Sequence, residues 1–333
     1  MTDRLVRQME EKELEEELRR EILEFYFIVR DFLNVSELVD ENYVVYTENH
    51  VEEGFRLRLF CVNPAENLGE YLKKGRSAIF FSATMFPMLY YRELLTTGRD
   101  AYGIYVQSPF PKENRRILIG SDVSSRYTRR NRAEYRKDRR IYCPGVSGRG
   151  REKLYGVFFR RIVLWKYVLQ VYEEEFSVDW VRCVCQTPDM TEQEREGFLE
   201  EFQEREGTLV GFCVLGGIFS EGVDLTGESL IGAVIVGTGL PQIGSQREIL
   251  KEYYDKKNHC GFRLCISLSG YEQGASGRRA RDPHKEDKGV ILLLDDRFWD
   301  RDYRGNSFPR EWQDRTRLQA GYGRRRSGDI LEV

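Results

Sequence analysis

The sequence predicts an α/β domain built on a mostly parallel sheet that helices cover on both faces. Short, continuous apolar runs such as residues 208–215 (TLVGFCVL) and 289–298 (GVILLLDDRF) are typical of strands that are buried on both faces. Segments with helical spacing, such as residues 191–204, lie between these runs. Glycines, hydroxyls and carboxylates follow several of the runs, as they do at the ligand-binding edge of an α/β sheet.

The composition limits the class of protein. The 333 residues are 41% hydrophobic and 32% charged, enough for one large globular domain or two smaller ones. The net charge of -3 excludes a uniformly basic coat for nucleic acid but allows local basic faces. Seven cysteines without a framework spacing favour free thiols in a reducing compartment. No apolar run approaches the roughly 20 residues of a membrane span, so we expect a cytoplasmic protein with no membrane contact.

The individual elements follow from the periodicity of the apolar residues. The first part of the chain is expected to form a long amphipathic helix, a hairpin with one wet face, a short helix and a buried strand that ends at Ser82. A second group of strands and one helix follows. These expected elements are residues 4–33, 43–62, 66–74 and 77–81 in the first part, and 116–123, 191–204, 208–215, 230–240 and 289–298 in the second.

Ser82-Ala83-Thr84 follows the run SAIFF directly. If SAIFF is a buried strand, these two hydroxyls lie at the carboxyl edge of a sheet, where α/β proteins bind ligands. The alternative is that the Ser and Thr simply cap the next helix.

Residues 216–224 (GGIFSEGVD) place glycines, a hydroxyl and two carboxylates on the loop that leaves the strand at 208–215. Glycine lets a phosphate or a sugar approach the backbone, and an acid can hold a ribose or a metal-bound water. The alternative is a glycine-rich turn whose acids are solvated.

Five separated blocks together, in this order and spacing, resemble the DinG-type, XPD-like DNA helicases of superfamily 2. The resemblance extends from about residue 20 to residue 312. The blocks are SAIFFSATM, SPF with RILIGSDVSSRY, GTLVGFCVLGGIFSEGVDL, LIGAVIVGTGLPQ and GVILLLDDRF.

This resemblance implies two RecA-like motor domains that clamp ATP and Mg2+ between them and move along single-stranded DNA, generally 5′ to 3′. It implies that residues 1–92 are the tail of the first motor domain, 93–320 the second RecA-like helicase C-terminal domain, and 321–333 a tail. The implied site residues are Ser82, Ala83 and Thr84 for coupling hydrolysis to DNA grip, Glu221, Gly222 and Asp224 for the nucleotide cleft, Ser220 for the DNA backbone, and Gln242 and Arg297 as support.

The chain departs from this family in its nucleotide-binding motifs. The sequence holds no GxxxxGK[ST] loop and no Asp-Glu-x-His box, the groups that cradle the phosphates and hold magnesium. We therefore expect that the chain alone binds neither ATP nor a metal and needs a missing N-terminal motor domain. Two alternatives stay open: a non-catalytic nucleic-acid-binding module, and a regulatory half completed by a separate chain that carries the phosphate loop.

Residues 263–284 depart from the family in another way. If Tyr271-Glu272-Gln273-Gly274 is encoded as TAT GAA CAA GGN, the same bases read one position later give Met-Asn-Lys. Synonymous codons for the whole segment give DFAYLYPGMNKVLQAAGRVIRT in that phase. This text resembles the family's strand, PGMNK turn and QAAGRVIR motif, whose arginines reach ATP. We therefore predict a local frameshift, and read the basic cluster Arg278, Arg279 and Arg281 as its product and not as a DNA-binding patch.

Residues 138–167 give further fragments of family text when shifted by one or two bases, so as written we expect this stretch to lack motif IV. Cys183 and Cys185 share one face of an apparent strand and are read as core thiols in preference to metal ligands. Asp296-Arg297, after the last apolar run, either contacts a neighbouring motif or forms a salt-bridged strand end.

Overall fold

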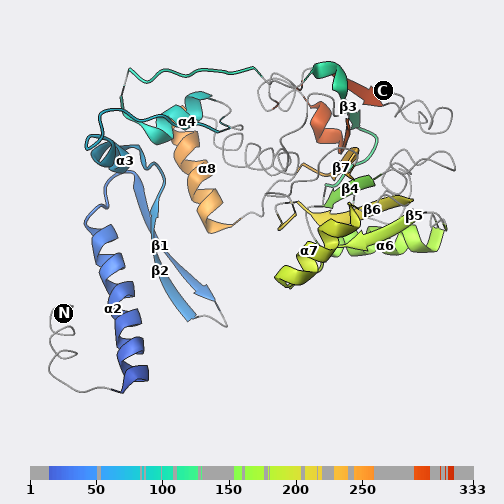
Figure 1. Cartoon of the computed structure of the whole chain (residues 1–333). Helices are drawn as coiled ribbons and strands as arrows, with labels where there is room; N and C mark the ends of the chain where they lie inside the picture. Colours follow the sequence, from blue (N-terminus) through green and yellow to red (C-terminus); the bar gives the residue numbers. More distant parts are fainter. Residues whose placement is uncertain are drawn as a thin grey trace.

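The chain folds around a parallel sheet, and the helix and hairpin of its N-terminal part lie apart from this sheet (Figure 1). This computed structural model describes residues 15–50, 54–82, 85, 88–98, 100–107, 111–126, 129, 154–159, 162–175, 179, 181–203, 207–215, 217–219, 229–238, 244–258, 289–300, 308, 312 and 314–318.

The N-terminal part confirms the expected long helix and hairpin. Helix α2 (Glu16–Ser36) buries none of its side chains, as expected for a largely solvated helix. Strands β1 (Tyr43–His50) and β2 (Gly54–Cys61) pair antiparallel, with Tyr43 opposite Cys61. The short helix is α3 (Ala65–Leu72), and α4 (Met88–Leu95) follows it.

The predicted strand at residues 77–81 is wrong. Ser77–Ser82 form no strand in the structure, and Ile79 and Phe81 are 86% and 89% exposed. The physical reason is that the backbone N–H and C=O groups of a buried strand must form hydrogen bonds with a neighbouring strand. None of the described strands pairs with this run. Ser82 is therefore not held at the carboxyl end of a strand.

The main sheet has seven strands in the order β5-β6-β4-β7-β8-β3-β9, and every pair of neighbours is parallel. The prediction of a mostly parallel α/β sheet is confirmed. The strands are β3 (Arg115–Gly120), β4 (Leu154–Phe159), β5 (Val181–Cys185), β6 (Thr208–Val214), β7 (Gly232–Val236), β8 (Gly289–Leu294) and β9 (Arg315–Leu318). A 3₁₀ turn, η1 (Lys112–Asn114), precedes β3.

Alternation along each strand divides the core between the two faces of the sheet. Helix α7 (Glu192–Glu201) covers one face, where Phe198 packs with Ile117, Leu209 and Ile291. Helix α6 (Ile162–Glu175) covers the other face, where its buried residues are Val168, Val171 and Tyr172. Both faces are thus apolar, which explains why the strands read as continuous apolar runs.

Helix α7 begins with a capping box. The Thr191 hydroxyl accepts a hydrogen bond from the Glu194 backbone N–H, and the Glu194 carboxylate accepts one from the Thr191 backbone N–H. This motif fixes the start of the helix at the position that the sequence predicts.

Strand β4 lies within residues 138–167, where no strand is predicted from the sequence. The stretch LYGVFF, as written, forms a strand between β6 and β7, in register from Tyr155 opposite Val210 and Gly232. The text as it stands therefore supplies an interior strand of the sheet, and α6 is the next element in the chain.

Residues 263–284, whose written text is expected to be irregular, lie outside the described residues. Among the described strands, β7 pairs directly with β8, and β8 pairs directly with β3.

Helix α8 (Ser245–Asn258) follows β7 in sequence and contacts the N-terminal part of the chain. In Figure 1 it lies beside α4. The Tyr253 hydroxyl donates to Asn42 Oδ1 at 3.3 Å, and the rings of Tyr254 and Tyr90 are 5.7 Å apart. Among the described residues, no helix is long and apolar enough to cross a membrane.

Candidate functional site

The strands of the sheet end on one common line. Phe159 at the end of β4 lies opposite Val214 and Val236, and Leu294 lies opposite Val236 and Gly120. The connection that leaves β4 runs across the sheet toward β5, whereas the connections that leave its two neighbours, β6 and β7, run in the opposite direction. Open α/β sheets bind their ligands at such a carboxyl edge, beside the switch in strand order.

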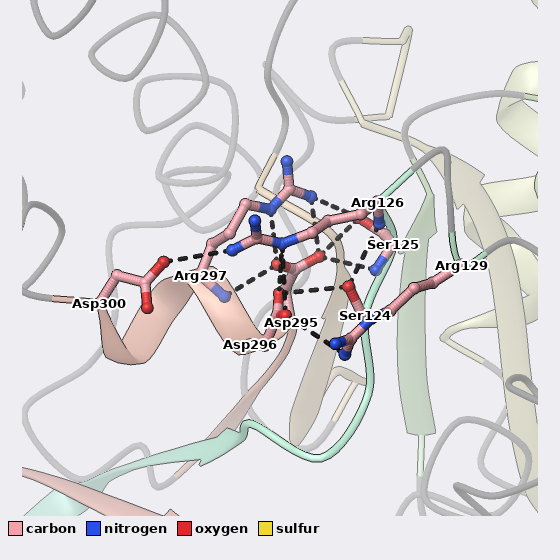
Figure 2. A network of polar contacts seen from close by, with 8 residues as sticks. All are labelled: Ser124, Ser125, Arg126, Arg129, Asp295, Asp296, Arg297 and Asp300. Atoms are coloured by element: carbon pink, nitrogen blue, oxygen red, sulfur yellow. Dashed lines mark hydrogen bonds and ion pairs between the residues drawn. The ribbon is translucent and has the colours of Figure 1, made fainter.

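A buried carboxylate lies on this edge, directly after β8. Asp295 is 0% exposed, and its Oδ2 accepts hydrogen bonds from the backbone N–H and the hydroxyl of Ser125, at 3.0 and 2.6 Å. Arg297 holds the same carboxylate through Nε to Oδ1 (2.7 Å) and Nη2 to Oδ2 (2.8 Å). Arg297 Nη2 also donates to Ser125 Oγ at 2.7 Å, so the three side chains form a closed ring of hydrogen bonds (Figure 2).

Further ion pairs surround this ring. Asp296 accepts from the Ser124 hydroxyl at 3.2 Å and from Arg126 Nε at 3.3 Å. Arg126 also reaches Asp300 at 3.3 Å, and Arg129 lies 3.8 Å from Asp296. Figure 2 shows that these groups come from two segments, the one after β3 and the one after β8. Three arginines thus neutralise three aspartates. The cluster connects the segments that follow the neighbouring strands β3 and β8.

The two adjacent carboxylates have opposite pKa shifts. Burial acts to raise the pKa of Asp295, but the hydrogen bonds and charge of Arg297, with the Ser125 hydroxyl, outweigh burial and hold that pKa below its usual value. Burial and the neighbouring Asp295 charge raise the pKa of Asp296. Asp295 is therefore the ionised member of the pair over the widest pH range.

Gly237 directly follows β7 and packs against Ser125 of this cluster. Its φ of +89° is in the left-handed region, and its N–H donates to the Leu294 carbonyl at 2.9 Å. A Cβ added at this position would lie 2.7 Å from Ser125 Oγ. Only glycine fits here, so β7 also contributes to the packing around Ser125.

Two of the sequence-predicted site residues are among those that the structure describes. Ser82 is exposed and outside any strand, and Arg297 is held in the ring with Asp295 and Ser125. For Arg297 the structure therefore supports the salt-bridged strand end, together with a contact to the neighbouring RILIGSDVSSRY segment. The predicted residues that lie outside the described residues are Ala83, Thr84, Ser220, Glu221, Gly222, Asp224 and Gln242.

Sequence reasoning missed Ser124, Ser125 and Asp295 as members of this edge. One signal could have indicated them: polar residues follow the apolar runs of β3 and β8 directly, and neighbouring parallel strands bring such positions together.

Burial raises the pKa of Cys185 to about 12, so this thiol, read as a core residue, stays protonated. No group of three metal-ligating side chains gathers within the described residues.

An all-parallel sheet with helices on both faces and polar groups along its carboxyl edge is the architecture of a doubly wound α/β domain, the class that includes RecA-like domains. Residues 151–315 match the family model of the helicase C-terminal domain. The chain is 27% identical over 285 residues to the "Probable ATP-dependent helicase MJ0942" of Methanocaldococcus jannaschii, a match that covers 80% of this chain and 41% of that protein. The chain thus spans less than half the length of that relative.

Two solved structures share the fold. The one titled "XPD_Helicase" has a TM-score of 0.56 at 16% identity, and the match covers 95% of this chain and 60% of that one. The one titled "XPD_APO" has a TM-score of 0.58 at 17% identity, covering 92% and 63%. Residues 151–315 therefore match a helicase C-terminal domain, and the chain shares the fold of the two XPD structures.

Proposed function

We propose that this chain is the second motor lobe of an ATP-dependent DNA helicase and serves nucleic-acid-stimulated ATP hydrolysis and unwinding, in the 5′ to 3′ direction. The observation that carries the proposal is the helicase C-terminal match over residues 151–315, which contains five of the seven parallel strands, β4 to β8, and ends at the first residue of β9.

The site we propose is the carboxyl edge beside β4. Segment 216–224 leaves the sheet at the end of β6, next to the switch in strand order. Glu221, Gly222 and Asp224 would line the nucleotide cleft from this lobe, and Ser220 would contact the DNA backbone. Ser82, Ala83 and Thr84 would couple hydrolysis to DNA grip, and Gln242 would support the cleft. The Asp295–Arg297–Ser125 ring would stiffen the far part of the same edge.

Binding of ATP and Mg2+ requires a phosphate loop and a metal-holding box, and this sequence encodes neither. The phosphate loop and the metal-holding box belong to a first motor domain in the family, and without a lysine and a bound metal the charge on the transferring phosphate is not stabilised. The isolated chain is therefore inactive in hydrolysis, and it acts in the cytoplasm with a first lobe that supplies these groups.

The frame-shifted reading of residues 263–284 is part of this proposal. In the corrected text, arginines stand at the positions of Ala280 and Pro283 and reach the ATP phosphates across the cleft. Resequencing the gene across these codons tests this reading directly. A confirmed sequence without the single-base changes, together with an ordered helix in the written text, would refute it.

The experiment for the nucleic-acid part of the function is binding of a labelled single-stranded oligo-dT, followed by fluorescence anisotropy at two salt concentrations. We expect binding that weakens as salt rises, because phosphate contacts release counterions. The absence of the phosphate loop from the sequence favours one alternative, a non-catalytic nucleic-acid-binding module. That module would bind DNA equally well but would gain no hydrolysis when a first lobe is added.

A further inference from the structure

Gln186 follows β5 at the carboxyl edge of the sheet and is only 5% exposed. Its backbone N–H donates to the Phe212 carbonyl at 2.9 Å, which extends the pairing of β5 and β6 by one residue. Its side-chain Oε1 accepts a hydrogen bond from the Val214 N–H, also at 2.9 Å. A buried glutamine on the edge strand therefore holds the last residue of its neighbour β6.

The Gln186 amide also sets the turn that follows β6. The Gly217 N–H donates to the Val214 carbonyl at 2.9 Å. A Cβ added to Gly217 would lie 2.9 Å from Gln186 Nε2 and 2.9 Å from the Val214 carbonyl oxygen. The carboxamide thus occupies the space under this turn, and glycine is needed for the chain to pass over it.

A second contact anchors the chain two residues further on. Phe219 is 5% exposed, and its ring stacks on that of Phe198 in α7, with centroids 4.2 Å apart and planes at 20°. The chain between Val214 and Phe219 is therefore fixed at both ends, by an amide on the edge strand and by an aromatic stack on the covering helix.

We infer that Gln186 is the positioning residue for the segment that begins at Ser220. The inference rests on the proposed function of Ser220, Glu221 and Asp224, which need a fixed starting point if they are to meet a ligand. Site residues on loops hold their geometry only when the residues beneath them are locked by packing and hydrogen bonds. An apolar side chain at position 186 would leave the Val214 N–H without its acceptor.

The test compares Gln186→Met with wild type by hydrogen exchange of single amides. Methionine keeps the length of the side chain and removes both polar atoms of the carboxamide. We expect the Val214 amide to exchange about threefold to tenfold faster, the effect of one hydrogen bond, while the amide of Leu292 in β8 keeps its rate. The matched control is Gln170→Met, which changes an exposed glutamine that bonds only Glu174 in the described contacts, and it should leave both rates unchanged.

Unchanged exchange at Val214 would overturn the inference. An equal acceleration at Val214 and Leu292 would also overturn it, because it would mean a general loss of stability. Gln186→Glu retains an acceptor oxygen for Val214 and should keep its exchange slow. This second variant keeps the inference testable if the methionine variant folds poorly.

Binding of labelled oligo-dT provides the functional readout. If wild type binds, Gln186→Met should weaken binding at least about threefold, in line with loss of one positioned contact, and Gln170→Met should not. Equal binding by Gln186→Met, with faster Val214 exchange, would refute the positioning role. If wild type does not bind, the proposed nucleic-acid function fails, and the exchange result at Val214 still decides whether Gln186 fixes the turn.

Discussion

Arg297 Nη2 donates to Ser125 Oγ at 2.7 Å, across 172 positions of the sequence. This contact connects the segment after β3 with the segment after β8, and both residues also hold the buried Asp295. Two neighbouring strands are thus joined at their ends as well as along their length. Because the ring includes a fully buried charge, the stability of the domain depends on all three members.

Asp295→Asn should destabilise the domain by about 3 kcal/mol at neutral pH, because it leaves the Arg297 charge without its buried partner. The effect depends on pH. The folded pKa of Asp295 lies below the usual 3.8, so its ionised form contributes stability in full above about pH 3.8, and this contribution is lost as the pH falls through the folded pKa. The difference in urea midpoint between wild type and variant should therefore shrink as the pH falls below 3.8.

Asp296→Asn is the matched control, since it changes the adjacent carboxylate. The folded pKa of Asp296 is raised, so its ionisation costs stability as the pH rises through that pKa. We expect this variant to be about as stable as wild type at neutral pH, or more stable. A larger loss for Asp296→Asn than for Asp295→Asn would contradict the assignment of Asp295 as the central group.

Gly211→Ala should destabilise the domain by about 1–3 kcal/mol, the usual cost of overpacking a core. Gly211 lies in β6, and a Cβ there would come within 2.5 Å of the Phe202 ring. The matched substitution is Gly197→Ala in α7, where a Cβ would meet nothing within 4 Å. That change should stabilise by about 0.5–1 kcal/mol, because alanine favours the helix. Thermal unfolding of the two variants measures both effects, and a similar shift for both would refute this description of the core.

The amides of residues 77–82 should exchange with almost no protection, because this run is exposed and outside any strand. The amides of Ile291 to Leu293 in the buried strand β8 should exchange slowest under the same conditions. Mass-spectrometric hydrogen exchange on the purified monomer distinguishes the two segments. Strong protection of residues 77–82 would mean that they pair with a strand after all.

The sequence predicted those elements whose apolar pattern is sufficient by itself. The first strand of the hairpin, β1, alternates between exposed and half-buried residues from Val45 to Asn49, and β6, β7 and β8 are continuous apolar runs, so these elements were predictable. The run at residues 77–81 has the same apolar character but no described neighbour, and sequence periodicity does not report pairing. Strand β4 was missed because residues 138–167 were read in another frame, although LYGVFF as written is apolar enough for a buried strand.

The candidate site was less predictable than the fold. Arg297 was singled out from its place after an apolar run, but Ser125 and Gln186 act through contacts with residues far away in sequence. Such contacts depend on the strand order, in which β3 neighbours β8 and β5 neighbours β6. A short-range pattern cannot give that order, because parallel neighbours are joined by long crossovers.

Restoring the phase-corrected text at residues 263–284 should make unfolding more cooperative. The written text is rich in serine and glycine, which favour loops, whereas the corrected text returns apolar residues at helical spacing. Differential scanning calorimetry compares the two chains through the ratio of calorimetric to van't Hoff enthalpy. If the repaired chain melts no more cooperatively than the original, the frameshift hypothesis is wrong.

Steady-state phosphate release in the presence of single-stranded DNA tests the central claim most directly. The chain alone should release no more phosphate than its Thr84→Ala variant, because the lysine, the metal site and the arginines for the transferring phosphate are missing or displaced. The phase-corrected chain, joined to a first lobe that carries the phosphate loop, should show DNA-stimulated hydrolysis that Thr84→Ala abolishes. Hydrolysis by the chain alone clearly above its Thr84→Ala control, or none in the joined and corrected chain, would contradict the assignment as the second half of a helicase motor.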